Sequence, residues 1–118
     1  MILKTIINSI IGARNKKMKT NKFYQYQRIV DENGEVVNGD YILGEGDEQF
    51  IIRCKNGFLN DVETDDGEIL PAFELVNGTH IEHWKNGLLH SEKTPAVIDI
   101  IDDTEEWWYE GRFIEPLE

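Results

Sequence analysis

Asn-Gly and Asp-Gly dipeptides recur at close intervals from residue 33 onward. Both central residues of a type I′ turn adopt positive φ, which Asn, Asp and Gly tolerate best, so these dipeptides are strong short signals for a β-hairpin. The dipeptides are Asn33-Gly34, Asn56-Gly57, Asp66-Gly67, Asn77-Gly78 and Asn86-Gly87, and Glu110-Gly111 is expected to turn the chain in the same way. We therefore expect a succession of hairpins.

Short runs of aromatic and β-branched residues fill the intervals between these turns, as is typical of strands. The expected strands are residues 23–30, 35–43, 49–54, 58–63, 69–76, 80–84, 88–92, 96–101, 106–110 and 112–115. No stretch after Phe23 has a helical period of useful length. We therefore predict a mainly β protein, an antiparallel β-hairpin meander that forms a repeat-like sheet.

Residues 1–22 follow a different pattern. Apolar residues at positions 2, 3, 6, 7, 10 and 11 lie on one face of a helix, and Gly12 is a typical helix stop. We therefore predict one short N-terminal helix over residues 1–11, followed by a basic arm that ends at Lys22. Three interpretations of the helix remain open: a cap docked on the β body, a helix at a surface or membrane interface, and a disordered leader.

The net charge of −11 is divided unevenly along the 118 residues. Residues 1–22 carry six Lys or Arg and no acid, whereas residues 23–118 carry the other six cations and all 23 acids, a formal charge of −17. The expected domains are therefore an amphipathic helix with a basic arm, 1–22, and an acidic β-hairpin repeat domain, 23–118. A body so negative disfavours nucleic acid and anionic membranes, and it speeds the encounter with a basic protein. Solubility alone is the other explanation.

Two stretches of the body match each other. Residues 55–60, Lys-Asn-Gly-Phe-Leu-Asn, align with residues 85–90, Lys-Asn-Gly-Leu-Leu-His, and a Pro-Ala pair follows each, at 71–72 and 95–96. Two-residue loops then pair Cys54 with Leu59, Trp84 with Leu89 and Trp108 with Phe113, so these six residues are expected to share one buried face. Trp107 and Tyr109 point to the other face, where they are either covered or exposed for binding.

The second copy of this repeat carries a resemblance to a known group. Residues 84–90, Trp-Lys-Asn-Gly-Leu-Leu-His, followed by residues 94–98, Thr-Pro-Ala-Val-Ile, resemble the unit of bacterial and phage β-hairpin repeat proteins that are MORN-like in the broad sense. That unit runs aromatic, two residues, Gly, two residues, His, then Pro-Ala and a second aromatic strand. The resemblance covers roughly residues 80–114 and implies an open β-meander used for protein contacts. The Gly-x-Gly spacing of standard MORN units is absent, so phospholipid binding is not implied.

No residue pattern points to catalysis, a metal or a cofactor. The register sets His83 opposite His90, with Glu92 nearby, but two imidazoles are one ligand fewer than a catalytic zinc site needs. Cys54 falls in the apolar layer, where a thiol is a small inert hydrophobe, and as the single cysteine it favours a reducing, cytoplasmic setting. There is no phosphate-binding Gly loop and no Ser-His-Asp signature. We therefore expect no enzyme, no metal and no cofactor.

These observations favour a non-catalytic protein-binding module whose acidic surface engages a basic partner, with no direct contact to nucleic acid and no membrane span. In its sharper form it is an inhibitor of a nucleic-acid-binding protein, encoded by a phage or mobile element against host defence, as anti-CRISPR proteins are. The candidate contact residues are Asp61, Glu63, Asp65, Asp66, Glu68, Asp102, Asp103, Glu105, Glu106, Trp107 and Tyr109. The alternative is a structural, self-assembling repeat protein, and a homodimer through residues 1–22 remains open.

Overall fold

The computed structural model describes residues 28–115. The predicted helix over 1–11 and the basic arm lie outside these residues. The strands are β1 (Gly39–Leu43), β2 (Phe50–Lys55), β3 (Phe58–Leu59), β4 (Val62–Glu63), β5 (Ile69–Leu70), β6 (Phe73–Leu75), β7 (His80–Glu82), β8 (Trp84–Lys85), β9 (Leu88–Leu89), β10 (Val97–Asp99), β11 (Thr104–Tyr109) and β12 (Arg112–Ile114). In the described part of the chain, the only helical element is a 3-10 turn at Gly46–Glu48.

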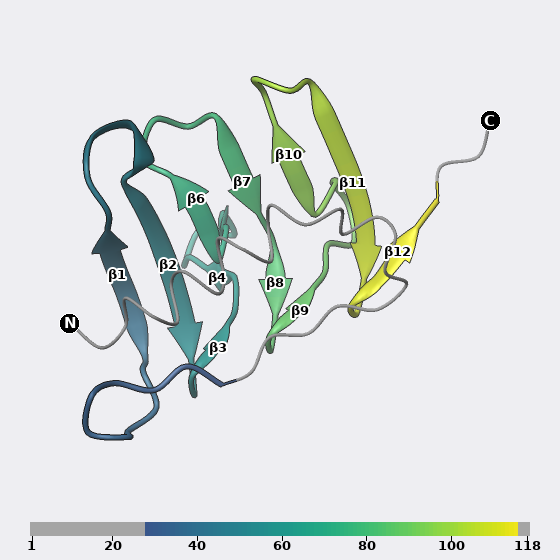
Figure 1. The fold of residues 1–118 in the computed structure, drawn as a ribbon. Coiled ribbons are helices and arrows are strands. Elements are labelled where there is room, and N and C mark those ends of the chain that lie inside the picture. Colours follow the sequence, from purple (N-terminus) through teal and green to yellow (C-terminus); the bar gives the residue numbers. More distant parts are fainter. Residues whose placement is uncertain (1–27, 116–118) are drawn as a thin grey trace.

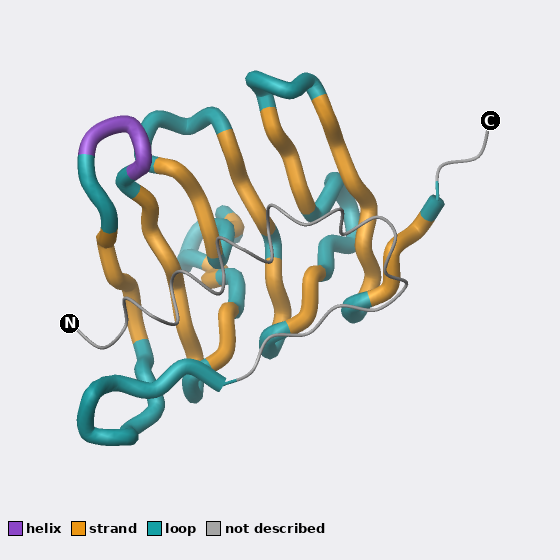
Figure 2. The backbone as a smooth tube through the Cα atoms, in the orientation of Figure 1, coloured by secondary structure: helices purple, strands orange, loops and turns teal. Residues whose placement is uncertain are grey.

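All strand pairs are antiparallel, which confirms the predicted mainly β class. The main sheet has the order β1-β2-β6-β7-β10-β11-β12, with β3 paired to β2 (Figure 1). Two small pairs, β4–β5 and β8–β9, complete the structure. Most neighbouring strands of the main sheet also follow one another in the chain. The exceptions are β2 with β6 and β7 with β10, and in each case the intervening chain leaves the main sheet before it returns (Figure 2).

Three of the six predicted turns have positive φ at both residues, as a type I′ turn requires, whereas at Asn33-Gly34, Asp66-Gly67 and Asn77-Gly78 only the glycine has positive φ. Asn56 and Gly57 have φ of 53° and 81°, Asn86 and Gly87 have 50° and 80°, and Glu110 and Gly111 have 47° and 81°. The strand pairs closed by these turns have the expected register, Cys54 with Leu59, Trp84 with Leu89, and Trp108 with Phe113.

One repeated hydrogen bond stacks these hairpins on one another. The turn glycine of each hairpin donates its N–H to a carbonyl of the preceding unit: Gly57 to Val37 at 2.8 Å, Gly87 to Leu59 at 2.9 Å and Gly111 to Leu89 at 2.8 Å. The residue after that carbonyl then accepts the N–H of the first turn residue: Asn38 from Asn56, Asn60 from Asn86 and His90 from Glu110. The units therefore stack as neighbours in a repeat array do.

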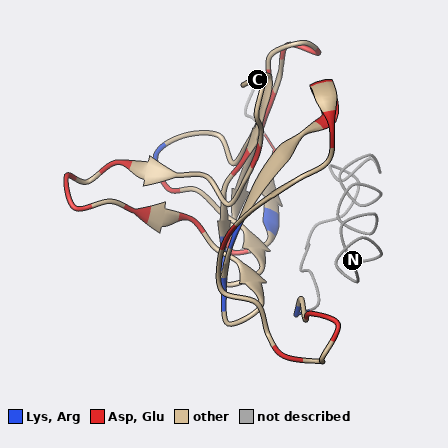
Figure 3. Cartoon of the chain, turned by 90° about the vertical axis from the view of Figure 1, so that its left-hand side faces the viewer, with Lys and Arg blue, Asp and Glu red and all other residues tan. Residues whose placement is uncertain are grey.

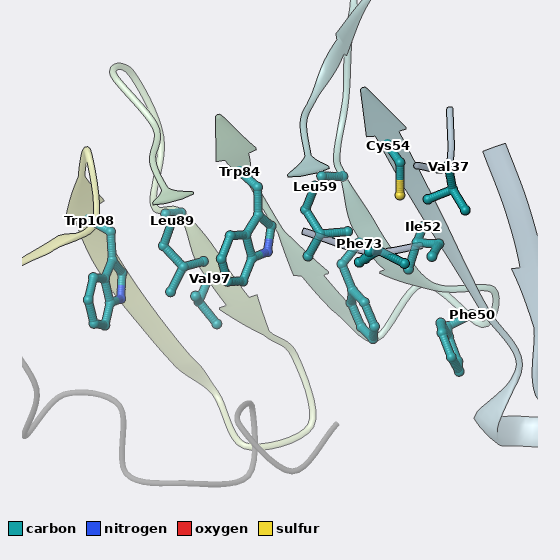
Figure 4. Close-up of a cluster of buried hydrophobic side chains, with 13 residues drawn as sticks. Val37, Phe50, Ile52, Cys54, Leu59, Phe73, Trp84, Leu89, Val97 and Trp108 are labelled. Carbon is teal, nitrogen blue, oxygen red and sulfur yellow. The ribbon is translucent and has the colours of Figure 1, made fainter. Parts of the chain in front are cut away.

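The expected buried face is present. Cys54, Leu59, Trp84, Leu89 and Trp108 are buried and lie in a row across the hairpins (Figure 4). Phe113 is half-buried and packs edge-on against Trp108, with ring centroids 5.3 Å apart. Each indole N–H is satisfied by the Glu two residues earlier: Trp84 donates to Glu82 at 3.1 Å and Trp108 to Glu106 at 3.0 Å. A buried indole N–H usually has such a hydrogen-bond partner.

Most of the predicted strands have different bounds. The strand predicted at 58–63 is divided into β3 and β4 and the one at 80–84 into β7 and β8, the one at 88–92 ends at Leu89, and residues 28–30 of the one at 23–30 form only a bridge. Three further differences have a local cause. The strand predicted at 35–43 begins only at Gly39, because Val36 makes an isolated bridge with Val30 instead. The strand predicted at 69–76 is divided at residues 71–72, since Pro71 has no N–H for a ladder bond, and its two halves join different sheets. The strand predicted at 96–101 ends at Asp99, whose carboxylate accepts the N–H of Asp102 and turns the chain.

Candidate functional site

An acidic hairpin projects from the main sheet. It comprises residues 61–70, contains β4 and β5, and is called the acidic finger below. Seen with the sheet edge-on, the finger extends away from the sheet and its acidic residues gather toward its tip (Figure 3). Val62 pairs with Leu70 and Glu63 with Ile69. Four exposed carboxylates follow one another along it, Glu63, Asp65, Asp66 and Glu68.

The tip of the finger is held by its own hydrogen bonds. Thr64 N–H donates to the Glu68 carbonyl at 2.8 Å, and the Glu68 N–H donates back to the Thr64 hydroxyl at 3.1 Å. The Thr64 hydroxyl also donates to the Asp66 carboxylate. This bond, assisted by the Glu68 N–H, lowers the pKa of Asp66 below its ordinary value. The tip therefore presents its negative charge on an ordered backbone.

Asp61 fixes the finger to the sheet at its root. One carboxylate oxygen, Oδ1, accepts the backbone N–H groups of Ala72 at 2.8 Å and Trp84 at 3.0 Å. The other oxygen, Oδ2, lies 2.8 Å from Nδ1 of His83. The returning end is held by Arg53, whose Nη1 donates to the Pro71 carbonyl at 2.6 Å. Asp61, which we predicted to contact a partner, thus has a structural role.

A groove with a volume of about 760 Å³ lies at the root of the finger. Glu63, Gly67 and Ile69 line it from the finger, and His83 and Lys85 from the strand beside it. The loop after β9 contributes the remaining polar groups, from His90, Ser91, Glu92, Lys93 and Thr94. The groove is thus polar and carries both signs of charge.

The histidines serve as hydrogen-bonding groups rather than as a ligand set. His90 Nδ1 accepts the N–H of Glu110 at 2.9 Å, and His83 Nδ1 is taken by Asp61. Within residues 28–115, no group of three or more His, Cys, Asp or Glu side chains is placed to hold a metal ion. The His of the repeat unit has a structural explanation here, because it caps the next turn.

The second predicted acidic cluster lies on β11 and on the turn that leads into it. Asp102, Asp103 and Glu105 are exposed there, remote in sequence from the finger. Glu106 is half-buried, and its carboxylate accepts the indole N–H of the buried Trp108. Trp107 and Tyr109 point to the opposite face from Trp108, as predicted, and are 39% and 48% exposed. Tyr109 packs on His90 with ring centroids 4.7 Å apart, next to the groove.

Sequence reasoning missed a buried polar cluster on the face of the sheet that carries Trp84. Nε2 of His80 lies 2.8 Å from Glu82, which is 1% exposed, and Nδ1 of His80 lies 2.9 Å from Asp99. Both ring nitrogens therefore face carboxylate oxygens, and only the doubly protonated imidazolium donates to both. Burial by itself would raise the pKa of Asp99. The hydrogen bond from the Asp102 N–H, together with the hydrogen bond and the electrostatic attraction to His80, outweighs burial, so the pKa of Asp99 is lowered.

Cys54 has the environment that was predicted for it. The residue is buried in the apolar row, and burial, followed by the nearby charge of Asp40, raises the pKa of its thiol to about 12. The thiolate is the nucleophilic form of cysteine, so a thiol held protonated is unreactive.

Fold and site together define a mainly β, hairpin-rich protein with an acidic finger. Comparisons with protein-family models, with characterised proteins and with solved structures found no match to this chain. The resemblance to MORN-like hairpin repeats therefore stays a prediction. In the part of the chain that the structure describes, no helix is both long and apolar enough to cross a membrane.

Proposed function

We propose that this protein is a non-catalytic binding module whose acidic finger inserts into a basic surface of a partner protein. The observation that carries the proposal is the finger itself, a projecting hairpin with four exposed carboxylates on an ordered tip. None of these four carboxylates has a Lys or Arg within ion-pair distance among the described residues. An acidic projection that has no counter-charge among residues 28–115 can attract the cations of a partner.

The finger also carries apolar area suited to a protein contact. Val62 and Ile69 are 39% and 47% exposed and are interspersed with the carboxylates. Interfaces combine an apolar centre with a charged rim, and complementary charge mainly raises the association rate and the specificity. Asp102, Asp103 and Glu105 extend the negative field over β11, and Trp107 and Tyr109 add exposed aromatic area there.

The sharper form of the proposal is an inhibitor that occupies the nucleic-acid site of its partner. A partner that binds nucleic acid carries a Lys- and Arg-rich groove, and the charge of −17 on residues 23–118 is complementary to it. The protein and the nucleic acid then compete for the same groove of the partner. In this form, a labelled oligonucleotide is displaced from the partner by the wild-type protein.

The test is affinity capture from extracts of the native host with three baits. The baits are the wild type, a finger variant (E63Q, D65N, D66N and E68Q) and a control variant that loses the same charge elsewhere (E32Q, E45Q, D47N and E48Q). We expect the wild type and the control to retain the same basic protein at physiological salt and the finger variant to lose it. Equal retention by all three baits contradicts the proposal.

A second candidate, self-assembly, is favoured by one feature of the sheet. Strand β1 pairs only with β2 among residues 28–115, and its Ile42 is 63% exposed. An open strand edge is a template for pairing with another chain. Sedimentation at increasing protein concentration tests this candidate. A stable monomer excludes it, whereas assembly that I42K abolishes supports it over the finger-binding proposal.

A further inference from the structure

We propose that the groove at the root of the acidic finger binds a phosphate group, with His83 at its centre. This site goes beyond the proposed contact with a basic partner, and of the four finger carboxylates only Glu63 lines it. The groove volume of about 760 Å³ is ample for a phosphate together with part of the molecule that bears it.

His83 is the side chain whose orientation is best fixed in this groove. Its Nδ1 is held at 2.8 Å by Asp61, whose other oxygen is occupied by two backbone N–H groups. The ring therefore presents Nε2, the nitrogen on its far edge, which has no hydrogen-bond partner among residues 28–115. The side chain is only 14% exposed, so a ligand that reaches it is largely desolvated.

Further donors line the same groove. Lys85 and Lys93 are two of the six cations in the acidic body, and neither forms an ion pair within the described part of the chain. The hydroxyls of Ser91 and Thr94, 2.9 Å apart, also line it. Two ammonium groups and two hydroxyls beside the His83 ring suit an anion with several acceptor oxygens. A concentration of donors in so acidic a protein points to an anionic ligand.

Three carboxylates also line the groove and oppose an anion. Asp61 already accepts two backbone N–H groups and faces Nδ1 of His83. Glu92 is 67% exposed and Glu63 is exposed on the finger, so solvent screens both. The remaining titratable neighbour, His90, accepts an N–H through Nδ1.

The test is an NMR titration with inorganic phosphate, in which the imidazole ¹⁵N signals are followed. We expect saturable shifts of the His83 ring nitrogens as phosphate is added. Replacing both lysines (K85Q with K93Q) should weaken binding by at least about tenfold, the effect of losing one charge-assisted hydrogen bond. K55Q is the matched control, because Lys55 holds the equivalent place in the other repeat copy and does not line the groove.

Two results overturn the proposal: absence of saturable His83 shifts, and shifts that persist unchanged in the K85Q/K93Q variant. Titrations with phosphoserine and with a nucleoside monophosphate then distinguish a phosphorylated peptide from a nucleotide as the source of the group. H83Q gives a second readout, since it should abolish the rise in melting temperature that phosphate produces over chloride at equal ionic strength. The finger variant changes one groove-lining residue, Glu63, but keeps Lys85, Lys93 and His83. Loss of partner capture therefore leaves the proposed phosphate-binding groups in place, and the two proposals fail separately.

Discussion

Glu82 and Glu106 occupy equivalent places in two successive hairpins, yet their surroundings differ. Each accepts the indole N–H of the Trp two residues later, but only Glu82 is fully buried and also contacts His80. Removing Glu82 takes away two buried polar contacts, those with His80 and with the Trp84 indole, although Asp99 still faces the other ring nitrogen of His80. E82A is therefore expected to lower the free energy of unfolding by about 3 kcal/mol. E106A, which removes one neutral-donor hydrogen bond, should cost about 1 kcal/mol.

Urea unfolding followed by tryptophan fluorescence measures both losses on the same scale. Equal losses in the two variants would show that the contact of Glu82 with His80 contributes nothing. Secondary structure by circular dichroism provides the check that each variant is folded before the comparison is made.

Asp99, at the other end of the same cluster, makes stability depend on pH. Its pKa is lowered in the folded state from the ordinary value of 3.8, so its ionised form stabilises the fold above that value. This contribution is lost as the pH falls through the lower pKa of the folded state. D99N should therefore have a lower urea midpoint than the wild type at pH 7. The gap should narrow below pH 3.8, and a gap that stays constant contradicts the assignment.

At the scale of elements, the turn glycines differ in what surrounds them. Gly57 and Gly78 both have φ of 81°, but a Cβ on Gly57 would meet the carbonyl oxygen of Ile29 at 2.8 Å, whereas a Cβ on Gly78 would meet nothing within 4 Å. G78A should cost about 1 kcal/mol, the strain of a left-handed alanine. G57A adds a backbone clash and should cost about 2–3 kcal/mol. Chemical denaturation compares them, and equal losses would mean that the two turns are equally open.

The same elements show what the sequence could predict. A two-residue loop fixes which residues pair across it, so the pairs Trp84–Leu89 and Cys54–Leu59 followed from the position of each Gly alone. The departure of the finger from the sheet did not follow, because it depends on Asp61 reaching Ala72, Trp84 and His83 across 11 to 23 positions. No local pattern encodes such contacts. The buried contact of His80 with Asp99, 19 positions apart, was missed for the same reason.

At the scale of the whole molecule, an acidic net charge is combined with a hairpin that projects from a sheet. The described strands form one antiparallel main sheet with a projecting finger, and the acids outnumber the cations by 23 to six over residues 23–118. The charge total was readable from the sequence, whereas the concentration of exposed carboxylates on one projection required the fold. Long-range attraction of this kind is screened by salt within about 10 Å at 0.1 M. Partner association should therefore slow steeply with salt, while dissociation changes little.

The most direct measurement is the dissociation constant of the captured partner for the wild type, the finger variant and the charge-matched control, each at low and at physiological salt. If the finger is the contact, the finger variant should bind at least about tenfold more weakly than the control, equivalent to about 1.4 kcal/mol. It should also have the shallower salt dependence, because four of the interacting charges are gone. Equal affinities and equal salt slopes for the two variants would contradict the account, since net charge alone would then explain the binding.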